Sequence, residues 1–125
     1  MSITPLLTIA TILVAVDSIY LYIIKDYFQN QIQIIQQTPV KINYLGAAIC
    51  YFFLAIGLNY FIIQPKKTMW EAFLLGLVIY GVYESTNYAL FSKWAFTTVA
   101  IDTLWGGALF AISTYIIQYF QLKTI

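Results

Sequence analysis

The 125-residue sequence has no histidine, no arginine and a single cysteine, Cys50. Histidine is the commonest general base and metal ligand, and arginine is the usual binder of phosphate and carboxylate groups. A lone cysteine excludes an intrachain disulfide and a paired metal or redox motif, and we expect Cys50 to be a small apolar packing residue. The net charge of +1 gives no field that attracts nucleic acid. We therefore predict no metal site, no cofactor and no nucleic-acid partner.

Charged residues are also scarce, at 9%, whereas 62% of the residues are hydrophobic and the mean hydropathy is +0.81. A soluble domain has about 25% charged and about 45–50% apolar residues. Four apolar stretches, near residues 3–24, 44–64, 70–91 and 95–120, each match the roughly 20 residues that cross a bilayer. The composition therefore predicts an integral, multi-pass membrane protein, with membrane lipid as its first partner.

The connections between these stretches are short and carry most of the lysines. Pro39 and Pro65 mark two of them, and only residues 92–94 separate the last two stretches, which must therefore form an antiparallel pair. We predict an all-α fold, an antiparallel bundle of four transmembrane helices in one membrane domain over residues 1–125. We call the end with the N-terminus and the connection after Pro65 the A end, and the end with residues 92–94 the B end.

The longest connection, from Asp26 to Asn43, has two interpretations. Phe28, Ile32 and Ile35 fall on one helical face, which is typical of an amphipathic helix on the membrane surface or of an arm that docks a partner. Alternatively, the first helix continues past the bilayer. We favour continuation, because residues 26–40 contain no cationic residue that would attract them to lipid headgroups.

Three carboxylic acids, Asp17, Glu84 and Asp102, interrupt the apolar stretches. Each costs on the order of 2.5–3.5 kcal/mol at the centre of a membrane helix, and such residues usually face the bundle interior and mark function. Measured from Lys25 and Lys93 at a rise of about 1.5 Å per residue, all three lie roughly 12–14 Å from the B end. The matching depth of the second helix falls near Tyr51. We expect at least one of the acids to carry a proton, because like charges this close do not all stay ionised.

Polar and aromatic side chains surround these acids in the sequence. Tyr80, Glu84 and Asn87 share one helical face, Tyr83 is adjacent, and Tyr20 lies one turn after Asp17. Trp105, one turn after Asp102, either walls the site or faces lipid. The complete candidate set for ligand binding is Asp17, Glu84, Asp102, Tyr80, Tyr83, Asn87, Tyr20 and Trp105.

Other residues favour architectural roles. Small-residue stretches around Gly106 and Gly57 suit close helix packing. Asn59, towards the A end, is expected to cap or bridge helices rather than bind ligand. Aromatic residues near the helix ends are typical of interfacial belts; they are Trp70, Trp94, Tyr44, Tyr60 and Tyr119.

The acid-containing strings resemble a known family. These strings are Asp17–Leu21 (DSIYL), Tyr80–Asn87 (YGVYESTN) and Asp102–Gly106 (DTLWG). Trp94, shortly after the second string, also resembles the family pattern. In order and spacing they are similar to the signatures of the domain-of-unknown-function 2177 family. Glu84 stands where that family usually has Asp, and Tyr20 where it often has Trp. The resemblance implies a small four-helix membrane protein of bacterial inner membranes, or of host or virion membranes in large DNA viruses, and supplies no activity.

These observations lead to three functional hypotheses. The first is a buried acidic site that binds or translocates a small cation, a proton or a polar solute, in a homo-oligomer because four helices are few for a transporter. The alternative is a structural component of a cell or virion membrane that organises lipid or partner proteins, with the acids as interhelical hydrogen-bonding groups. The third is a lipid-modifying enzyme. We assign no catalytic residue and favour a non-enzymatic role.

Overall fold

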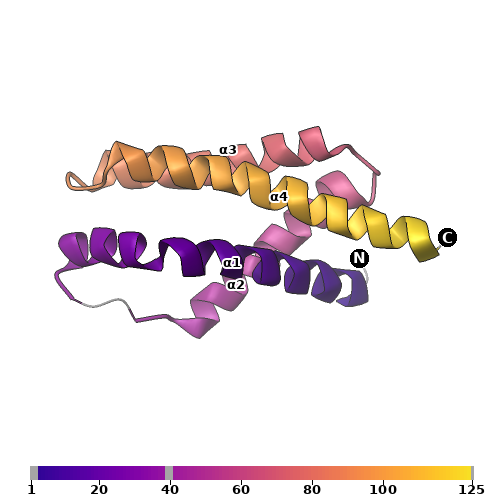
Figure 1. Ribbon diagram of the computed structural model, residues 1–125, viewed down its shortest axis with the longest axis horizontal. Coiled ribbons are helices and arrows are strands. Elements are labelled where there is room, and N and C mark those ends of the chain that lie inside the picture. The colour runs from indigo at the N-terminus through magenta and orange to yellow at the C-terminus, as the bar shows by residue number, and fades with distance from the viewer. Residues whose placement is uncertain (1–2, 39–40, 125) are drawn as a thin grey trace.

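The computed structural model describes residues 3–38 and 41–124, except for the side chains of residues 122–124. These residues form α1 (Ile3–Gln36), α2 (Tyr44–Leu58), a π-helical turn η1 (Asn59–Ile63), α3 (Met69–Leu90) and α4 (Phe96–Thr124). Figure 1 shows the helices running alternately up and down one long axis, with both ends of the described chain at the A end. The predicted all-α antiparallel bundle is therefore confirmed. The expected turn at Pro39 lies outside the described residues.

The helix ends follow from local side-chain chemistry. Asn43 caps α2 by accepting a hydrogen bond from the backbone N–H of Gly46, and Thr68 and Glu71 form a capping box at the start of α3. α1 ends before Gln37, whose φ of 61° is the left-handed conformation common just after a helix. The turn between η1 and α3 contains Pro65, as the sequence predicts.

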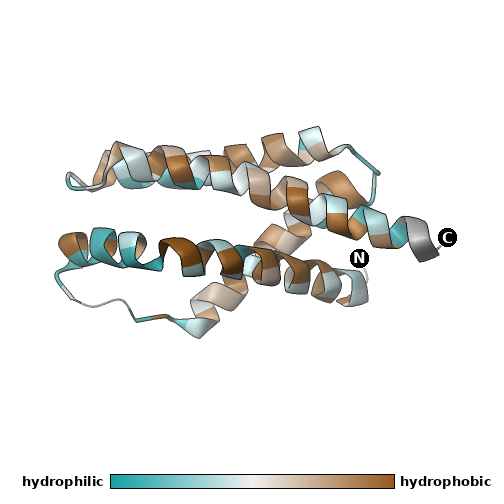
Figure 2. Cartoon of the chain, viewed as in Figure 1, coloured by the Kyte–Doolittle hydropathy of each residue, from teal (hydrophilic) through white to brown (hydrophobic). Residues whose placement is uncertain are grey.

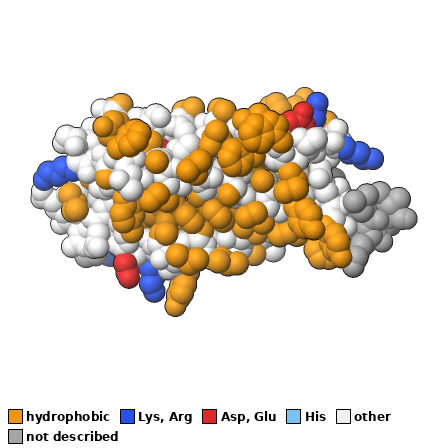
Figure 3. All heavy atoms as spheres, turned by 45° about the horizontal axis from the view of Figure 1, so that its top comes forward, with side chains coloured by type: hydrophobic (Ala, Val, Ile, Leu, Met, Phe, Trp, Pro, Cys, Tyr) orange, Lys and Arg blue, Asp and Glu red, His pale blue; other side chains and the backbone are white. Residues whose placement is uncertain are grey.

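Within the part of the chain that the structure describes, three helical segments are long and apolar enough to span a membrane: Ile3–Gln36, Tyr44–Ile63 and Phe96–Gln121. α3 is not among them, because it carries Glu71, Glu84 and Asn87, although it lies alongside α4 (Figure 1). Figure 2 shows hydrophobic residues along the middle of the bundle, and in Figure 3 charged side chains lie towards its two ends. The chain is therefore a helical membrane protein.

α3 and α4 pack through glycines. A Cβ atom added to Gly76 would lie 2.1 Å from the carbonyl oxygen of Gly106, and one added to Gly106 would lie 2.2 Å from Cγ of Tyr80. Gly107 is similarly close to the ring of Phe73. The two backbones approach this closely only because these residues have no side chain. The predicted packing role of the Gly106 stretch is confirmed.

α1 and α2 meet less closely. A Cβ atom added to Gly57 would meet nothing within 4 Å, so this glycine does not serve the close packing predicted for it. Cys50 is exposed on α2, so the expectation that it packs in the interior is wrong. Between the two helices lies a groove of about 580 Å³, which we call the α1–α2 groove; its wall includes Thr11, Ala15 and Tyr51.

Candidate functional site

The buried acids meet in the interior of the bundle. Asp17, on α1, accepts a hydrogen bond on Oδ2 from the hydroxyl group of Tyr51 on α2. Its other oxygen, Oδ1, accepts one from Nε1 of Trp105 on α4, at 2.8 Å. Both carboxyl oxygens of Asp17 are therefore satisfied by donors from two other helices, and the residue ties α1, α2 and α4 together.

Asp102 and Glu84 form the second part of the cluster. The hydroxyl group of Tyr20 donates to Oδ1 of Asp102 at 3.3 Å, and the carboxyl group of Asp102 lies within electrostatic range of that of Glu84. Glu84 is 0% exposed. Its Oε1 accepts a hydrogen bond from Nε1 of Trp94 at 2.8 Å, and its Oε2 has no partner among the described residues. Glu84 is thus the least satisfied acid in the protein interior.

An aromatic stack joins the two parts. The rings of Tyr20 and Trp105 are parallel, with centroids 4.4 Å apart and an interplanar angle of 8°. Tyr20 donates to Asp102, and Trp105 donates to Asp17, so each ring of the stack fixes one acid. We call Asp17, Glu84 and Asp102, with the four aromatic residues that donate to them, the acid cluster; these four are Tyr20, Tyr51, Trp94 and Trp105.

The depth predicted for Asp17 needs a correction. α1 does not end near Ile24 but continues to Gln36, as the favoured interpretation of the long connection expects. Lys25 consequently lies within the helix and does not mark its end. In the antiparallel register of α1 and α4, Asp17 faces Trp105 and Tyr20 faces Asp102. Asp17 is therefore about one turn farther from the B end than Asp102, rather than in the same layer.

The extension of α1 binds the B end of the α3–α4 hairpin. Gln31 is buried, and its Nε2 donates to the carbonyl oxygen of Lys93 at 3.0 Å. Its Oε1 accepts from the backbone N–H of Ala95 and from the hydroxyl group of Thr98, each at 3.0 Å. Tyr27 bonds to the same threonine at 2.8 Å. The first N–H groups of a helix have no partner within it, and Gln31 supplies one at the start of α4.

The remaining predicted residues have different surroundings. Tyr80 is partly buried, and its ring covers Gly106, within electrostatic range of Asp17 and Asp102. Asn87 is buried on α3, and its Nδ2 has no partner among the described residues. Tyr83 is 58% exposed and faces away from the acids. The structure therefore brings Asp17, Glu84, Asp102, Tyr20 and Trp105 together, keeps Tyr80 and Asn87 near them, and leaves Tyr83 outside.

Sequence reasoning missed three residues that hold this arrangement: Tyr51, Trp94 and Gln31. The depth comparison places Tyr51 of the second helix at the same depth as the acids, so the sequence contains a signal for this residue. Trp94 was predicted to lie in an interfacial belt, which is wrong, because it is 7% exposed and donates to Glu84. The other predicted belt residues are exposed, as expected: Trp70, Tyr44, Tyr60 and Tyr119.

The donors around the acids define the chemistry that the cluster supports. Every hydrogen bond that the acids accept comes from a neutral hydroxyl or indole group. Over residues 3–38 and 41–124, no group of three or more His, Cys, Asp or Glu side chains is arranged to hold a metal ion. The cluster is thus a set of carboxyl groups in the bundle interior that accept hydrogen bonds from neutral donors.

Comparison with known proteins places the chain in a family. No curated protein and no solved structure matches it. Residues 2–119 match the model of the family described as predicted membrane protein (DUF2177), and this match includes all three acids. That family description carries no activity. The chain therefore belongs to the DUF2177 family of predicted membrane proteins, as the acid-containing strings in its sequence predict.

Proposed function

We propose that the acid cluster is a membrane-embedded site that binds and passes protons, with the Glu84–Asp102 pair holding the proton. The surroundings of Glu84 carry this proposal, because its side chain is 0% exposed, its Oε2 has no partner among the described residues, and its carboxyl group lies within electrostatic range of that of Asp102. Two ionised carboxylates side by side in a low-dielectric interior repel strongly. A shared proton removes one charge and supplies the missing donor.

A proton fits this site better than a larger solute does. Neither of the two grooves described for this chain is lined by Glu84 or Asp102. Tyrosine hydroxyl groups, which both donate and accept, approach the acids from outside. Tyr51 lies in the wall of the α1–α2 groove and donates to Asp17, and Tyr20 donates to Asp102. Because four helices are few for a complete path, we propose that translocation requires a homo-oligomer.

Infrared difference spectroscopy on the purified protein tests the proton-binding step. We expect the carbonyl band of a protonated, buried carboxyl group, which diminishes as the pH rises and is altered or lost in Glu84→Gln and in Asp102→Asn. Matched controls are Glu71→Gln in the capping box and Asp26→Asn on the exposed face of α1. These controls should keep the band. A spectrum with no such band at any pH, or a band unaffected by either interior variant, would contradict the proposal.

Proton flux into proteoliposomes tests the translocation step. We expect wild type and the two control variants to carry flux, and we expect Glu84→Gln and Asp102→Asn to reduce it by about tenfold or more, because general acid–base groups typically contribute 10²–10⁴-fold. Flux that is equal in all five proteins would contradict translocation and leave proton binding to the infrared result.

A structural role is the second candidate, and the two donors to Asp17 favour it. Asp17 accepts hydrogen bonds from both α2 and α4, which is the arrangement of an interhelical tie. Such bonds average about 0.6 kcal/mol in membrane proteins. If the acids serve only this role, Asp17→Asn and Glu84→Gln lower the unfolding temperature in detergent and leave flux and pH response unchanged. The infrared and flux measurements therefore separate the two functions.

A further inference from the structure

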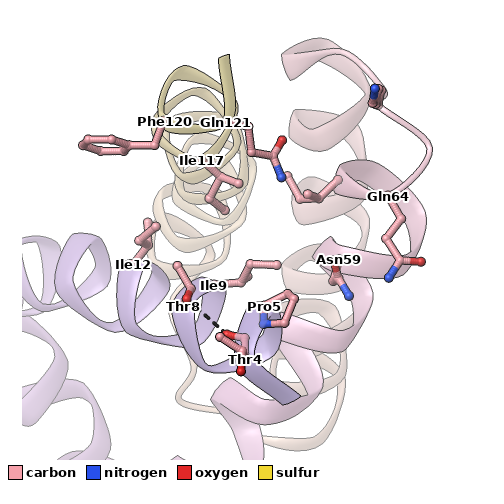
Figure 4. A pocket seen from close by; sticks show the side chains of 12 residues that line it. Thr4, Pro5, Thr8, Ile9, Ile12, Asn59, Gln64, Ile117, Phe120 and Gln121 are labelled. Atoms are coloured by element: carbon pink, nitrogen blue, oxygen red, sulfur yellow. Dashed lines mark hydrogen bonds between the residues drawn. The ribbon is translucent and has the colours of Figure 1, made fainter. Parts of the chain in front are cut away.

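A second groove, of about 870 Å³, lies at the A end between α1, η1 and α4 (Figure 4). We call it the A-end groove. Pro5 and Ile9 of α1 and Ile117 of α4 contribute to its mainly apolar walls, and none of the described residues that line it is an acid. Ligand pockets in proteins are typically about 300–1,000 Å³, apolar, and equipped with a few polar groups that fix the ligand. The size and the lining of this groove match that description.

One polar group of the A-end groove is the buried side chain of Asn59. It is 2% exposed, and its Nδ2 has no hydrogen-bond partner among the described residues. Figure 4 shows Asn59 across the groove from Pro5 and Ile9. A buried amide donor without an acceptor is unfavourable, and natural proteins rarely leave one. Asn59 is the C-cap residue of α2, as the capping expectation has it, whereas its amide nitrogen bridges to no described helix. An acceptor from outside the described residues would satisfy this donor.

Two hydroxyl groups of α4 share this condition. Ser113 and Thr114 are each 0% exposed, and their oxygens have no partner among the described residues. Thr114 lies one helical turn before Ile117, which lines the groove. The described interior at the A end thus contains these two hydroxyl groups and the Asn59 amide without partners, whereas Glu84, Asn87 and Thr103 have unpartnered atoms elsewhere in the bundle.

The backbone at Asn59 is also unusual. Asn59 begins the π-helical turn η1, and the backbone N–H of Gln64 donates to its carbonyl oxygen, five residues earlier, at 2.9 Å. π-helical turns are rare and occur frequently at functional sites. Gln64 and the exposed Lys66, which follow this turn, also line the groove and give it a cationic group where the chain leaves the membrane. Basic residues in pockets between transmembrane helices bind anionic lipid headgroups.

We propose that the A-end groove binds one anionic phospholipid of the surrounding bilayer. An acyl chain lies along the apolar walls, and an ester carbonyl oxygen accepts a hydrogen bond from Nδ2 of Asn59. The phosphate is bound by Lys66. Ester and phosphate oxygens are acceptors, so they complement a groove whose unpartnered groups include an amide donor and whose charge is positive. The surrounding membrane supplies this ligand, and its hydrocarbon matches the apolar lining.

The first test uses the purified full-length protein in detergent, with phosphatidylglycerol and phosphatidylcholine of identical chains as probes. A ligand that binds the folded state raises the unfolding temperature. We expect a larger rise with phosphatidylglycerol, its loss in Thr8→Phe, and its retention in Thr11→Phe. These two threonines form a matched pair. Both are exposed on α1 and donate to a carbonyl four residues earlier, but Thr8 lines the A-end groove and Thr11 the α1–α2 groove.

The second test removes the amide with Asn59→Leu, which keeps a side chain of similar size. We expect the lipid-free unfolding temperature to rise, because an unsatisfied polar group is removed. We also expect binding of phosphatidylglycerol to weaken by about tenfold, because its hydrogen bond is lost. A merely structural Asn59 gives the opposite sign for the lipid-free protein, and that result overturns the proposal.

Two further outcomes decide the matter. Equal responses to both lipids, or a response that Thr8→Phe leaves unchanged, overturn the proposal, because they indicate general contact with lipid. Glu84→Gln should keep the phosphatidylglycerol response, because Glu84 does not line the A-end groove. Proton binding at the acid cluster and lipid binding at the A end therefore succeed or fail independently.

Discussion

The pair α3 and α4 and the pair α1 and α2 are held by different forces. α3 and α4 meet through backbone contacts at Gly76 and Gly106 that leave no space for a methyl group. α1 and α2 leave a groove of about 580 Å³ between them, and Gly57 of α2 has open space around it. Helix association in a membrane depends on close van der Waals packing and on interhelical hydrogen bonds. The first pair relies on close backbone packing. α1 and α2 instead contribute larger apolar side chains to the core and are joined by the hydrogen bond from Tyr51 to Asp17.

This difference explains where the acids are. The hydrogen bonds of Tyr20, Tyr27 and Gln31, and that between Trp105 and Asp17, join α1 to α4 or to the turn before it. Asp17 also accepts one from Tyr51 of α2. The acid cluster therefore lies along the seam between a tightly packed hairpin and a helix attached to it by polar contacts. A seam of this kind holds polar groups in the interior without interrupting glycine-mediated packing.

The largest effect is expected where the hairpin is tightest. Gly76→Ala places a Cβ atom 2.1 Å from the backbone carbonyl oxygen of Gly106, so the two helices must separate. Overpacking of this kind costs about 3 kcal/mol, and we expect the unfolding temperature in detergent to fall sharply. The matched control on the same helix is Gly81→Ala, whose Cβ atom lies 3.5 Å from Cγ2 of Thr103, an ordinary contact. Equal stability of the two variants would show that close approach does not hold the hairpin.

A smaller effect is expected where α1 meets the hairpin. Gln31→Ala leaves the N–H of Ala95 and the carbonyl oxygen of Lys93 without their side-chain partners. We expect a loss of about 1 to 2 kcal/mol and faster hydrogen exchange at the Ala95 amide, while the amides in the middle of α3 keep their protection. Gln29→Ala, on the exposed face of the same helix, is the control. Unchanged exchange at Ala95 would mean that the extension of α1 does not hold the start of α4.

Much of the fold was predictable because hydrophobic length and lysine position report membrane crossings directly. The two interior connections with clear turn signals, at Pro65 and at residues 92–94, appear where the sequence indicates. The end of α1 was harder to place, because Lys25 interrupts the apolar pattern without interrupting the helix. A lysine on an exposed helix face has the same sequence signature as one at a helix end, and only the contacts of Gln31 distinguish them.

The candidate site was predictable in its acids and less so in their partners. An acid in an apolar stretch is costly anywhere except the bundle interior. The interior positions of Asp17, Glu84 and Asp102 were therefore predictable from the sequence. Aromatic residues carry no such constraint, because an indole is equally suited to a lipid interface and to a buried hydrogen bond. For this reason the sequence favours an interfacial belt for Trp94 and the candidate site for Tyr83. In the structure, Trp94 is buried and donates to Glu84, whereas Tyr83 is exposed.

The smallest expected effect on stability concerns Tyr83, which lies outside the acid cluster. Tyr83→Phe removes a hydroxyl group from a side chain that is 58% exposed, and we expect the free energy of unfolding to stay within about 0.5 kcal/mol of wild type. The carboxyl bands in the infrared spectrum should not move. Tyr20→Phe, the same chemical change on α1, removes the donor to Asp102 and should shift its band. A shift of the carboxyl band in Tyr83→Phe would mean that Tyr83 contacts the acid cluster. It would contradict the placement of Tyr83 on the face of the α3–α4 hairpin that points away from α1.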